Sequence, residues 1–237
     1  MSHSARFDMQ PGILYVVATP IGNLADISER AKSTLAECDL VACEDTRVTG
    51  GLLGKLGIKK TMFVNENSRE KSVAPALLEK LIEGKNIALL SDAGTPCISD
   101  PGFRIVRECR RAGIKVVPIP GACAFISALC ASGLPSDSFL FAGFLPPKTS
   151  ARKAFFEKYA DFPHTLIFYE SPYRIEKFAD DALEVFGGER VVCFAKEISK
   201  IYERFFVGTL RDVCAELKNA STKGEFTVIV APGDFKL

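Results

Sequence analysis

The sequence has only two histidines, His3 and His164, and this scarcity excludes a metal site that is built from several imidazole ligands. Its eight cysteines include no pair with the CxxC spacing of zinc or redox sites. Several of them lie in apolar stretches, where a free cysteine behaves as a small buried hydrophobic residue. We therefore expect no metal, no disulfides and a reducing compartment.

Long hydrophobic runs are also missing. The first apolar run, residues 13–18, is far too short to span a bilayer, and the polar segment before it lacks the order of a secretory signal. These absences predict a cytoplasmic protein without membrane association. With 237 residues, 47% of them hydrophobic, the chain can build two cores. We expect a flexible leader over residues 1–12, an N-terminal α/β domain over residues 13–120 and a C-terminal α/β domain over residues 121–237.

A large excess of positive charge is the third absence. The formal net charge is +1, whereas proteins that bind nucleic-acid phosphates over a broad surface are usually strongly basic. This balance argues weakly against an RNA substrate and leaves room for a local basic track. Two groups of basic residues could form such a track or could be ordinary solvated faces. They are Lys148, Arg152, Lys153 and Lys158, and Arg190, Lys196, Lys200 and Arg204.

In the first half of the chain, strand-like and helix-like segments alternate, which is typical of a parallel α/β sheet. Asp26 followed by Glu29 indicates a capping box for a helix that ends near Cys38. Helical spacing of apolar residues recurs over residues 72–84 and 103–112. The expected strands are residues 13–18, 40–43, 62–64, 87–90 and 115–118.

The second half begins with a helix-like segment over residues 122–132 and continues with strands. Too few residues separate 193–197 from 203–207 for a crossover helix, so we expect this pair to be antiparallel and the second sheet to be mixed. The expected strands are residues 139–142, 165–169, 191–195, 201–207 and 226–231.

The loop over residues 90–102, LSDAGTPCISDPG, follows an apolar strand and precedes a helix. Open α/β sheets bind their ligands at this position, where glycines allow close approach of the backbone and prolines fix its path. Asp92 and Asp100 supply carboxylates for hydroxyl, amino or cationic groups. The composition therefore predicts a ligand-binding loop.

A second loop, VATPIGN over residues 17–23, invites interpretation as a dinucleotide-binding turn. That fingerprint needs G-x-G-x-x-G leading directly into a helix, and here Thr19 and Pro20 replace the glycines. The sequence therefore argues against a nicotinamide-type dinucleotide site.

Several segments together make the chain similar to a known family. In order and spacing they resemble the ribosomal RNA small subunit methyltransferase I family, which belongs to the tetrapyrrole methylase superfamily. The resemblance covers nearly the whole chain and implies two α/β domains, a fold different from the ordinary methyltransferase fold, and S-adenosylmethionine held in the cleft between the domains. The segments that carry it are LYVVATPIGNLADI (14–27), ACEDTR (42–47), SDAGTPCISDPG (91–102), PIPGACA (118–124), GLPSDSF (133–139), FYESPYR (168–174) and KGEFTVIV (223–230).

The resemblance also implies which residues hold the methyl donor. The first loop lines the cleft through Pro20, and backbone amides at the start of the helix after residue 121 could bind the donor's carboxylate. For Phe168 and Phe226 the alternative is plain core packing, and for Asp92 it is a turn or helix cap. The residues that match the donor-binding positions are Asp92, Ala93, Gly94, Thr95, Gly121, Cys123, Ala124, Phe168, Phe226 and Thr227.

The catalytic candidates follow from the chemistry of the acceptor. A ribose 2′-hydroxyl is a poor nucleophile until a base takes its proton or a cation stabilises the alkoxide. Glu44 and Asp45 follow a buried strand, Arg47 is close enough to orient a carboxylate or hold a phosphate, and Glu197 ends another strand. Charged residues at strand ends are also often merely solvated. Lys148, Arg152, Lys153, Lys196 and Lys200 are the candidate RNA contacts.

Three functions remain open at this point. The resemblance implies S-adenosylmethionine-dependent 2′-O-methylation of a cytidine in small-subunit (16S) ribosomal RNA near the decoding centre, within the assembled subunit and by a homodimer. The alternative is a C-methylase of corrin or porphyrin precursors, which shares the fold and the donor loops. A non-enzymatic RNA-binding or assembly factor is the third. The EDTR and FYESPYR segments favour the first over the second.

Overall fold

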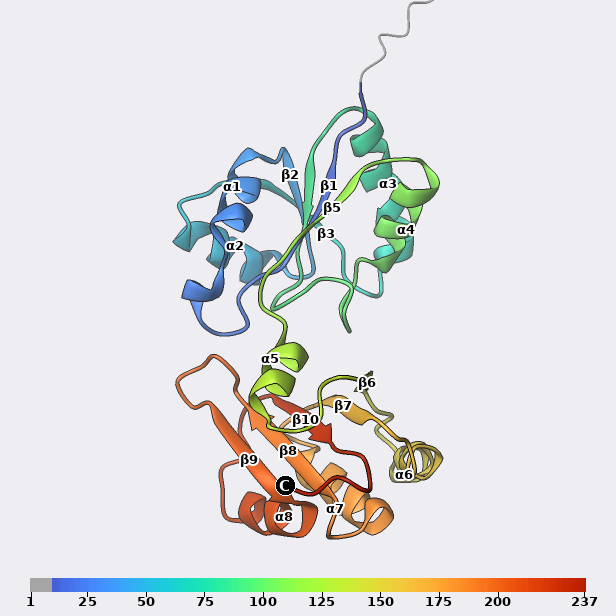
Figure 1. Ribbon diagram of the computed structural model, residues 1–237. Coiled ribbons are helices and arrows are strands. Elements are labelled where there is room, and N and C mark those ends of the chain that lie inside the picture. Colours follow the sequence, from blue (N-terminus) through green and yellow to red (C-terminus); the bar gives the residue numbers. More distant parts are fainter. Residues whose placement is uncertain (1–9) are drawn as a thin grey trace, which may run out of the picture. The chain divides into compact units, whose positions relative to one another are not determined.

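A computed structural model describes residues 10–237, so most of the predicted leader lies outside the described residues. The chain folds into two compact units (Figure 1). The first comprises Leu24–Ala122 together with the described residues before Ile21, and the second comprises Ile21–Asn23 and Cys123–Leu237. Each unit has its own sheet and its own hydrophobic cores.

The first unit is built on a five-stranded, all-parallel sheet with strand order β3-β2-β4-β1-β5. The predicted alternation of strands and helices is confirmed, and both ends of every strand lie within one residue of the predicted ends. The strands are β1 (Leu14–Val17), β2 (Leu40–Cys43), β3 (Thr61–Val64), β4 (Ile87–Leu89) and β5 (Val116–Ile119).

Helices cover both faces of this sheet (Figure 1). Figure 1 shows α1 and α2 on one side and α3 and α4 on the other. The strands alternate accordingly: Ile87 and Leu89 of β4 pack into the core under α3 and α4, and Ala88 packs into the core under α1 and α2. The helices are α1 (Glu29–Glu37), α2 (Thr46–Lys55), α3 (Glu70–Ile82) and α4 (Phe103–Arg111), with a short 3-10 turn η1 (Leu24–Asp26) before α1.

The expected capping box at Asp26 is wrong by two residues. Asp26 lies in the η1 turn, and Ser28 is the N-cap of α1, with its hydroxyl oxygen accepting a hydrogen bond of 3.1 Å from the backbone N–H of Ala31. A serine in an extended conformation satisfies one of the free amides of the first turn as well as an aspartate does, so the cap moved to the better placed residue.

The second unit contains a mixed sheet with strand order β6-β7-β10-β8-β9. The pair β6 and β7 is parallel, and the other pairs are antiparallel, including β8 with β9. The predicted mixed sheet and its antiparallel pair are therefore confirmed. The predicted strand 201–207 starts three residues too early, because the apolar Ile201 and Tyr202 are exposed in the turn before β9. The strands are β6 (Phe139–Phe144), β7 (Thr165–Glu170), β8 (Val191–Lys196), β9 (Arg204–Thr209) and β10 (Phe226–Val230).

Two cores also flank this sheet. The larger one is rich in phenylalanine and lies under three helices, α6 (Thr149–Lys158), α7 (Ile175–Phe186) and α8 (Leu210–Lys218). The smaller one packs under α5 (Ala124–Ala131). The central strands of both sheets are thus buried on both faces, which explains why they are nearly continuous runs of apolar residues. No helix among residues 10–237 is long and apolar enough to cross a membrane.

Candidate functional site

The carboxyl edge of the first sheet is the place where ligand chemistry is expected. The connections that follow the adjacent strands β1 and β4 lead into helices on opposite faces of the sheet, α1 and α4 respectively. This arrangement is a topological switch point, the position at which open α/β sheets bind ligands. The two predicted loops, residues 17–23 and 90–102, begin there.

Hydrogen bonds tie these loops together. Thr19 N donates to the Gly94 carbonyl at 2.9 Å, and Gly94 N donates to the Thr19 carbonyl at 3.1 Å. The hydroxyl of Ser91 donates to the same Gly94 carbonyl at 3.2 Å. Thr95 Oγ1 donates to the Ala122 carbonyl at 3.0 Å, which ties in the loop that follows β5. Loops after three adjacent strands thus form one connected backbone surface.

Two glycines permit this close arrangement. Gly94 has a φ of 81°, a backbone conformation that residues with a side chain rarely adopt. A Cβ at Gly121 would lie 2.9 Å from Ala18 Cβ, so this position also leaves no room for a side chain. Farther along the loop, Cys97 and Ser99 have φ values of 71° and 63°. Backbone conformations of this kind in residues other than glycine are costly and concentrate at functional loops.

Acidic side chains gather at the same edge. Asp92 Oδ1 accepts a 3.0 Å hydrogen bond from the backbone N–H of Asp45, which ties the loop after β4 to the one after β2. Burial raises the pKa of Asp92. Burial, followed by the nearby carboxylates of Asp100 and Asp92, raises the pKa of Glu44. A raised pKa brings a carboxyl group closer to the range in which it can accept and return protons near neutral pH.

Asp45 and Arg47 form a different kind of pair. Asp45 is the N-cap of α2, where its Oδ1 accepts from Arg47 N at 2.8 Å, and the Arg47 guanidinium contacts both carboxylate oxygens. The hydrogen bonds from the Arg47 side chain and backbone lower the pKa of Asp45 to about 2. Such a carboxylate is a weak base, so Asp45 serves to hold the helix and the arginine. The Arg47 side chain is 88% exposed and can still meet an anion.

Sequence reasoning missed Asn65, which directly follows β3. Its backbone N–H donates to the Cys43 carbonyl at 2.7 Å, which places it beside Glu44 at the end of the neighbouring strand. Asn65 is 1% exposed, and neither its side-chain oxygen nor its nitrogen has a hydrogen-bond partner among the described residues. A buried amide without partners costs free energy unless a ligand or water satisfies it. Its place after an apolar strand, in the sequence VNEN, was the available signal.

The donor-site candidates on the strands of the second unit are buried inside its fold. Phe168 and Phe226 are buried in the phenylalanine-rich core, and Thr227 is buried in β10. The Phe168 ring contacts those of Phe155, Phe156 and Phe178. Core packing, the alternative interpretation of Phe168 and Phe226, accounts for both rings, and we leave them out of the proposed donor site.

The loop at the start of α5 carries two further donor candidates. Cys123 is the N-cap of α5 and makes no side-chain capping hydrogen bond, and Ala124 is the first helical residue. The third amide of this segment, Phe125 N, donates to Tyr169 Oη at 3.3 Å.

Glu197 lies in the turn after β8, where it organises its own neighbours. Its Oε1 accepts from Lys200 Nζ at 2.8 Å and from Glu225 N at 2.9 Å. Burial raises the pKa of Glu197, but the bonds from Lys200 and the Glu225 backbone outweigh burial and lower it. Lys196 is buried and donates to the Ser221 carbonyl at 2.6 Å. These groups stabilise the turn, and Glu197 has the properties of a poor base.

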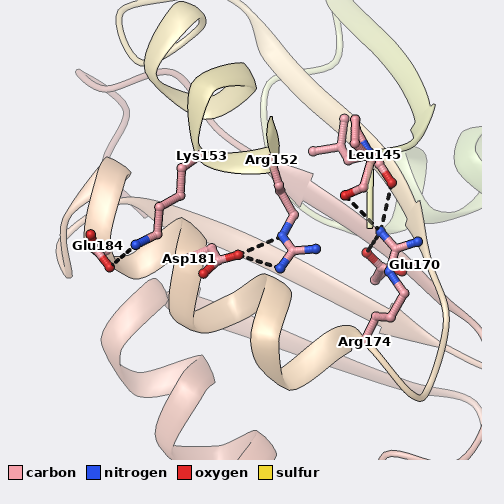
Figure 2. Close-up of polar contacts among 8 residues, drawn as sticks. Leu145, Arg152, Lys153, Glu170, Arg174, Asp181 and Glu184 are labelled. Atoms are coloured by element: carbon pink, nitrogen blue, oxygen red, sulfur yellow. Dashed lines mark hydrogen bonds and ion pairs between the residues drawn. The ribbon is translucent and has the colours of Figure 1, made fainter. Parts of the chain in front are cut away.

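Most of the predicted RNA contacts are also engaged within the protein. Arg152 is 1% exposed and donates through Nε to Asp181 Oδ2 at 2.9 Å (Figure 2). Lys153 pairs with Glu184, as Figure 2 shows. Because Arg152 is buried in an ion pair between α6 and α7, we remove it from the candidate RNA surface. Lys148 is exposed and has no ion-pair partner among residues 10–237.

Comparisons with known proteins identify the fold of the chain. The family model described as Tetrapyrrole (Corrin/Porphyrin) Methylases matches residues 13–214. Among solved structures, the methyltransferase CobJ has a TM-score of 0.70 at 17% identity, with 95% of this chain and 96% of that chain covered. A uroporphyrin-III-C-methyltransferase from Thermus thermophilus has a TM-score of 0.62 at 20% identity, covering 94% and 93%. The fold is therefore that of the tetrapyrrole methylases.

Relatives with similar sequences show which family of tetrapyrrole methylases is concerned. The Haemophilus influenzae protein named ribosomal RNA small subunit methyltransferase I is 54% identical over 92% of this chain and 78% of its own length. The Escherichia coli O157:H7 protein of the same name is 48% identical over 97% of this chain and 81% of its own length. This chain belongs to the ribosomal RNA small subunit methyltransferase I family of the tetrapyrrole methylases.

Proposed function

We propose that this chain transfers a methyl group from S-adenosylmethionine to the 2′-hydroxyl of a cytidine in small-subunit ribosomal RNA, near the decoding centre. The observation that carries the proposal is the 54% identity, over 92% of the chain, to a protein named for methylation of that RNA. The two solved structures compared above are 20% and 17% identical to this chain and support the fold alone. The RNA substrate is therefore favoured over a porphyrin precursor.

The carboxyl edge of the first sheet fits the methyl donor. S-adenosylmethionine presents hydroxyl groups, an amino acid group and an adenine ring, and it supplies an electrophilic methyl group on a sulfonium. The buried amide of Asn65, which has no partner among residues 10–237, can donate to and accept from such groups, and Asp92 can accept from hydroxyl or amino groups. The backbone around Gly94 and Gly121 lets a ligand approach closely because no side chain stands in the way.

Glu44 is the best candidate for proton acceptance. When the ribose oxygen forms its bond to the methyl carbon, the sulfur keeps the electron pair of the bond that breaks, and the hydroxyl proton needs an acceptor. Of the carboxylates named for this role, Glu44 has a raised pKa, whereas those of Asp45 and Glu197 are lowered. Arg47, with its guanidinium exposed, would hold a phosphate of the RNA near this edge.

The partner proposed is the assembled small subunit, and the active form proposed is a homodimer. The high apolar content of two modest units supports the dimer, because such chains leave hydrophobic surface to cover. Light scattering at micromolar protein concentration should return the mass of two chains. A monomer mass would contradict this part of the proposal.

A direct test incubates the purified chain with labelled S-adenosylmethionine and three acceptors: small ribosomal subunits, free small-subunit RNA and a porphyrin precursor. We expect the label in the subunits, and mass spectrometry of nuclease fragments should place it on one ribose. Glu44→Gln should lower the rate about 100-fold or more, the usual contribution of a general base, while donor binding is kept. Label in the porphyrin precursor alone would overturn the proposal in favour of a C-methylase.

A further inference from the structure

Two loops of the second unit begin at the same edge of its sheet. Strands β6 and β7 are parallel, and their register pairs Phe144 with Tyr169 near their carboxyl ends. The segments that follow, residues 145–148 and 171–174, therefore leave the sheet side by side. Their sequences are LPPK and SPYR, so three prolines limit the conformations of the backbone at this edge.

Arg174 fastens the two loops to each other, as Figure 2 shows. Its Nη2 donates to the Leu145 carbonyl at 2.7 Å and lies 3.4 Å from the Pro146 carbonyl. The same nitrogen lies 3.1 Å from Glu170 Oε2, and Glu170 Oε1 accepts from Ser171 N at 2.8 Å. Because Glu170 is 1% exposed, this ion pair anchors the loops to the interior of the unit.

Two aromatic side chains on or next to these loops are exposed to solvent. Tyr173 is 96% exposed and Phe144 is 56% exposed. The Tyr173 ring stacks on no other ring among residues 10–237, whereas Phe144 contacts the ring of Tyr169 at a centroid distance of 5.6 Å. Lys148 stands at the end of the first loop as an exposed cation without an ion-pair partner in the described part of the chain. We call Phe144, Lys148 and Tyr173 the β6–β7 edge.

We propose that the β6–β7 edge binds an unpaired nucleotide stretch of RNA, with a base stacked on Tyr173 and a phosphate held by Lys148. This inference rests on the proposed RNA substrate and names where that RNA is contacted. An exposed aromatic ring and an exposed lysine on loops that leave two adjacent strands fit single-stranded RNA, whose bases stack on aromatic faces while lysines neutralise the phosphates. The contacts of Arg174 support this role because they hold the backbones of the two loops together, so the loops need little reordering on binding. Glu176, an exposed carboxylate at the start of α7, limits the positive field, so stacking should contribute most.

The test measures binding of a fluorescent single-stranded RNA of ten nucleotides, and of the same RNA annealed to its complement, by anisotropy. Alanine in place of a stacking aromatic typically weakens binding about 5- to 150-fold, so we expect Tyr173→Ala to raise Kd about tenfold or more for the single strand. Tyr173→Phe keeps the stacking face and should stay within about twofold of the unchanged protein. Lys148→Ala should weaken binding less and reduce its salt dependence by about one phosphate contact.

Tyr202→Ala is the matched control. Tyr202 is 78% exposed, lies in the turn between β8 and β9 and is outside the β6–β7 edge. It should leave Kd within about twofold, and thermal melting should show that both tyrosine variants stay folded. Equal Kd values for Tyr173→Ala and the unchanged protein would overturn the inference. So would a change in oligomer mass on Tyr173→Ala, because the edge would then be an interface between two copies.

The outcome can be separated from that of the proposed function. If the chain methylates small subunits and Tyr173→Ala does so at the normal rate, the inference fails and the function stands. If RNA binding depends on Tyr173 but no ribosomal RNA is ever methylated, the function fails and the inference stands.

Discussion

The two sheets expose different chemistry at their carboxyl edges. At the all-parallel sheet, carboxylates and the buried amide of Asn65, which has no hydrogen-bond partner among the described residues, collect on loops that are fastened by backbone hydrogen bonds and by the Asp92 side chain. At the parallel pair of the mixed sheet, the exposed rings of Phe144 and Tyr173 and the exposed Lys148 lie on or next to loops that the ion pair of Arg174 with the buried Glu170 holds together. The first set suits a small ligand with hydroxyl and amino groups, and the second suits a polyanion with stacking bases.

Basic residues that could contact RNA in the sequence are mostly paired within the folded protein. Five basic residues were candidate RNA contacts from the sequence, and four of them are engaged with Asp181, Glu184, Glu197, Glu225 or the Ser221 carbonyl. A basic residue in the sequence is therefore a weak indicator of a binding surface until its partners are known.

The largest expected effect is a loss of unfolding free energy that differs between two neighbouring basic residues of α6. Arg152→Ala leaves the carboxylate of Asp181 buried without its partner, and loss of one member of a buried pair typically costs about 3–5 kcal/mol of unfolding free energy. The partner of Lys153, Glu184, is 67% exposed, so Lys153→Ala should cost about 0–1 kcal/mol. Urea denaturation of both variants measures the difference. Equal losses would show that the Arg152 pair contributes no more than a surface contact.

A smaller effect is expected in the loop of the first sheet. Gly102 has a φ of 134°, and a Cβ there would lie 2.8 Å from both Leu89 Cδ2 and Cys97 Sγ. Gly102→Ala should therefore destabilise the protein by about 1–3 kcal/mol. Gly51→Ala is the control, because a Cβ at that position of α2 meets nothing within 4 Å and alanine favours a helix by up to about 1 kcal/mol. Thermal melts that rank the two variants in the opposite order would contradict the close packing of this loop.

The smallest effect concerns the pH dependence of Asp45. Its folded pKa of about 2 lies below the ordinary value of 3.8, so the ionised carboxylate stabilises the fold above pH 3.8 and loses this effect as the pH falls through about 2. Carboxyl NMR titration of Arg47→Ala should show the Asp45 pKa moving upward, because the side-chain bond from Arg47 is the largest cause of the shift. Arg69→Ala, which removes an exposed arginine paired with Glu66, should leave it unchanged. An unchanged Asp45 pKa in Arg47→Ala would show that the arginine side chain does not cause the shift.

The strands of both sheets could be predicted from the sequence because they are short apolar runs bounded by turn residues. Their strong signal comes from burial on both faces, which removes polar residues from the strand interior. Helix α2 carried no such signal: its sequence TRVTGGLLGK contains three glycines, and packing of Leu53 into the core stabilises it where propensity does not. The start of α1 was misplaced because Asp26 and Ser28 are both good caps, and only the tertiary path of the chain chooses between them.

The candidate site was predictable where a role depends on the backbone. Glycine and proline loops at strand ends could be located from their composition, since those residue types set the chain path directly. The roles of charged side chains could not, because they depend on partners far away in sequence: Arg152 meets Asp181, and Lys200 meets Glu225. Asn65 escaped notice because a single polar residue after a strand is a weak signal, and its burial without hydrogen-bond partners among the described residues is visible only in the structure.

We propose that the carboxyl edge of the first sheet binds the methyl donor while the β6–β7 edge contacts the RNA. Calorimetric titration of S-adenosylmethionine into Asp92→Ala and Tyr173→Ala tests it directly. Asp92→Ala should weaken donor binding by about 1–3 kcal/mol, about 5- to 150-fold in Kd, because it removes a partly buried polar partner. Asp92→Asn keeps an acceptor for the backbone of Asp45 and should lose less, and Tyr173→Ala should bind the donor normally. Donor affinity that is unchanged in Asp92→Ala, or lost in Tyr173→Ala, would contradict the claim.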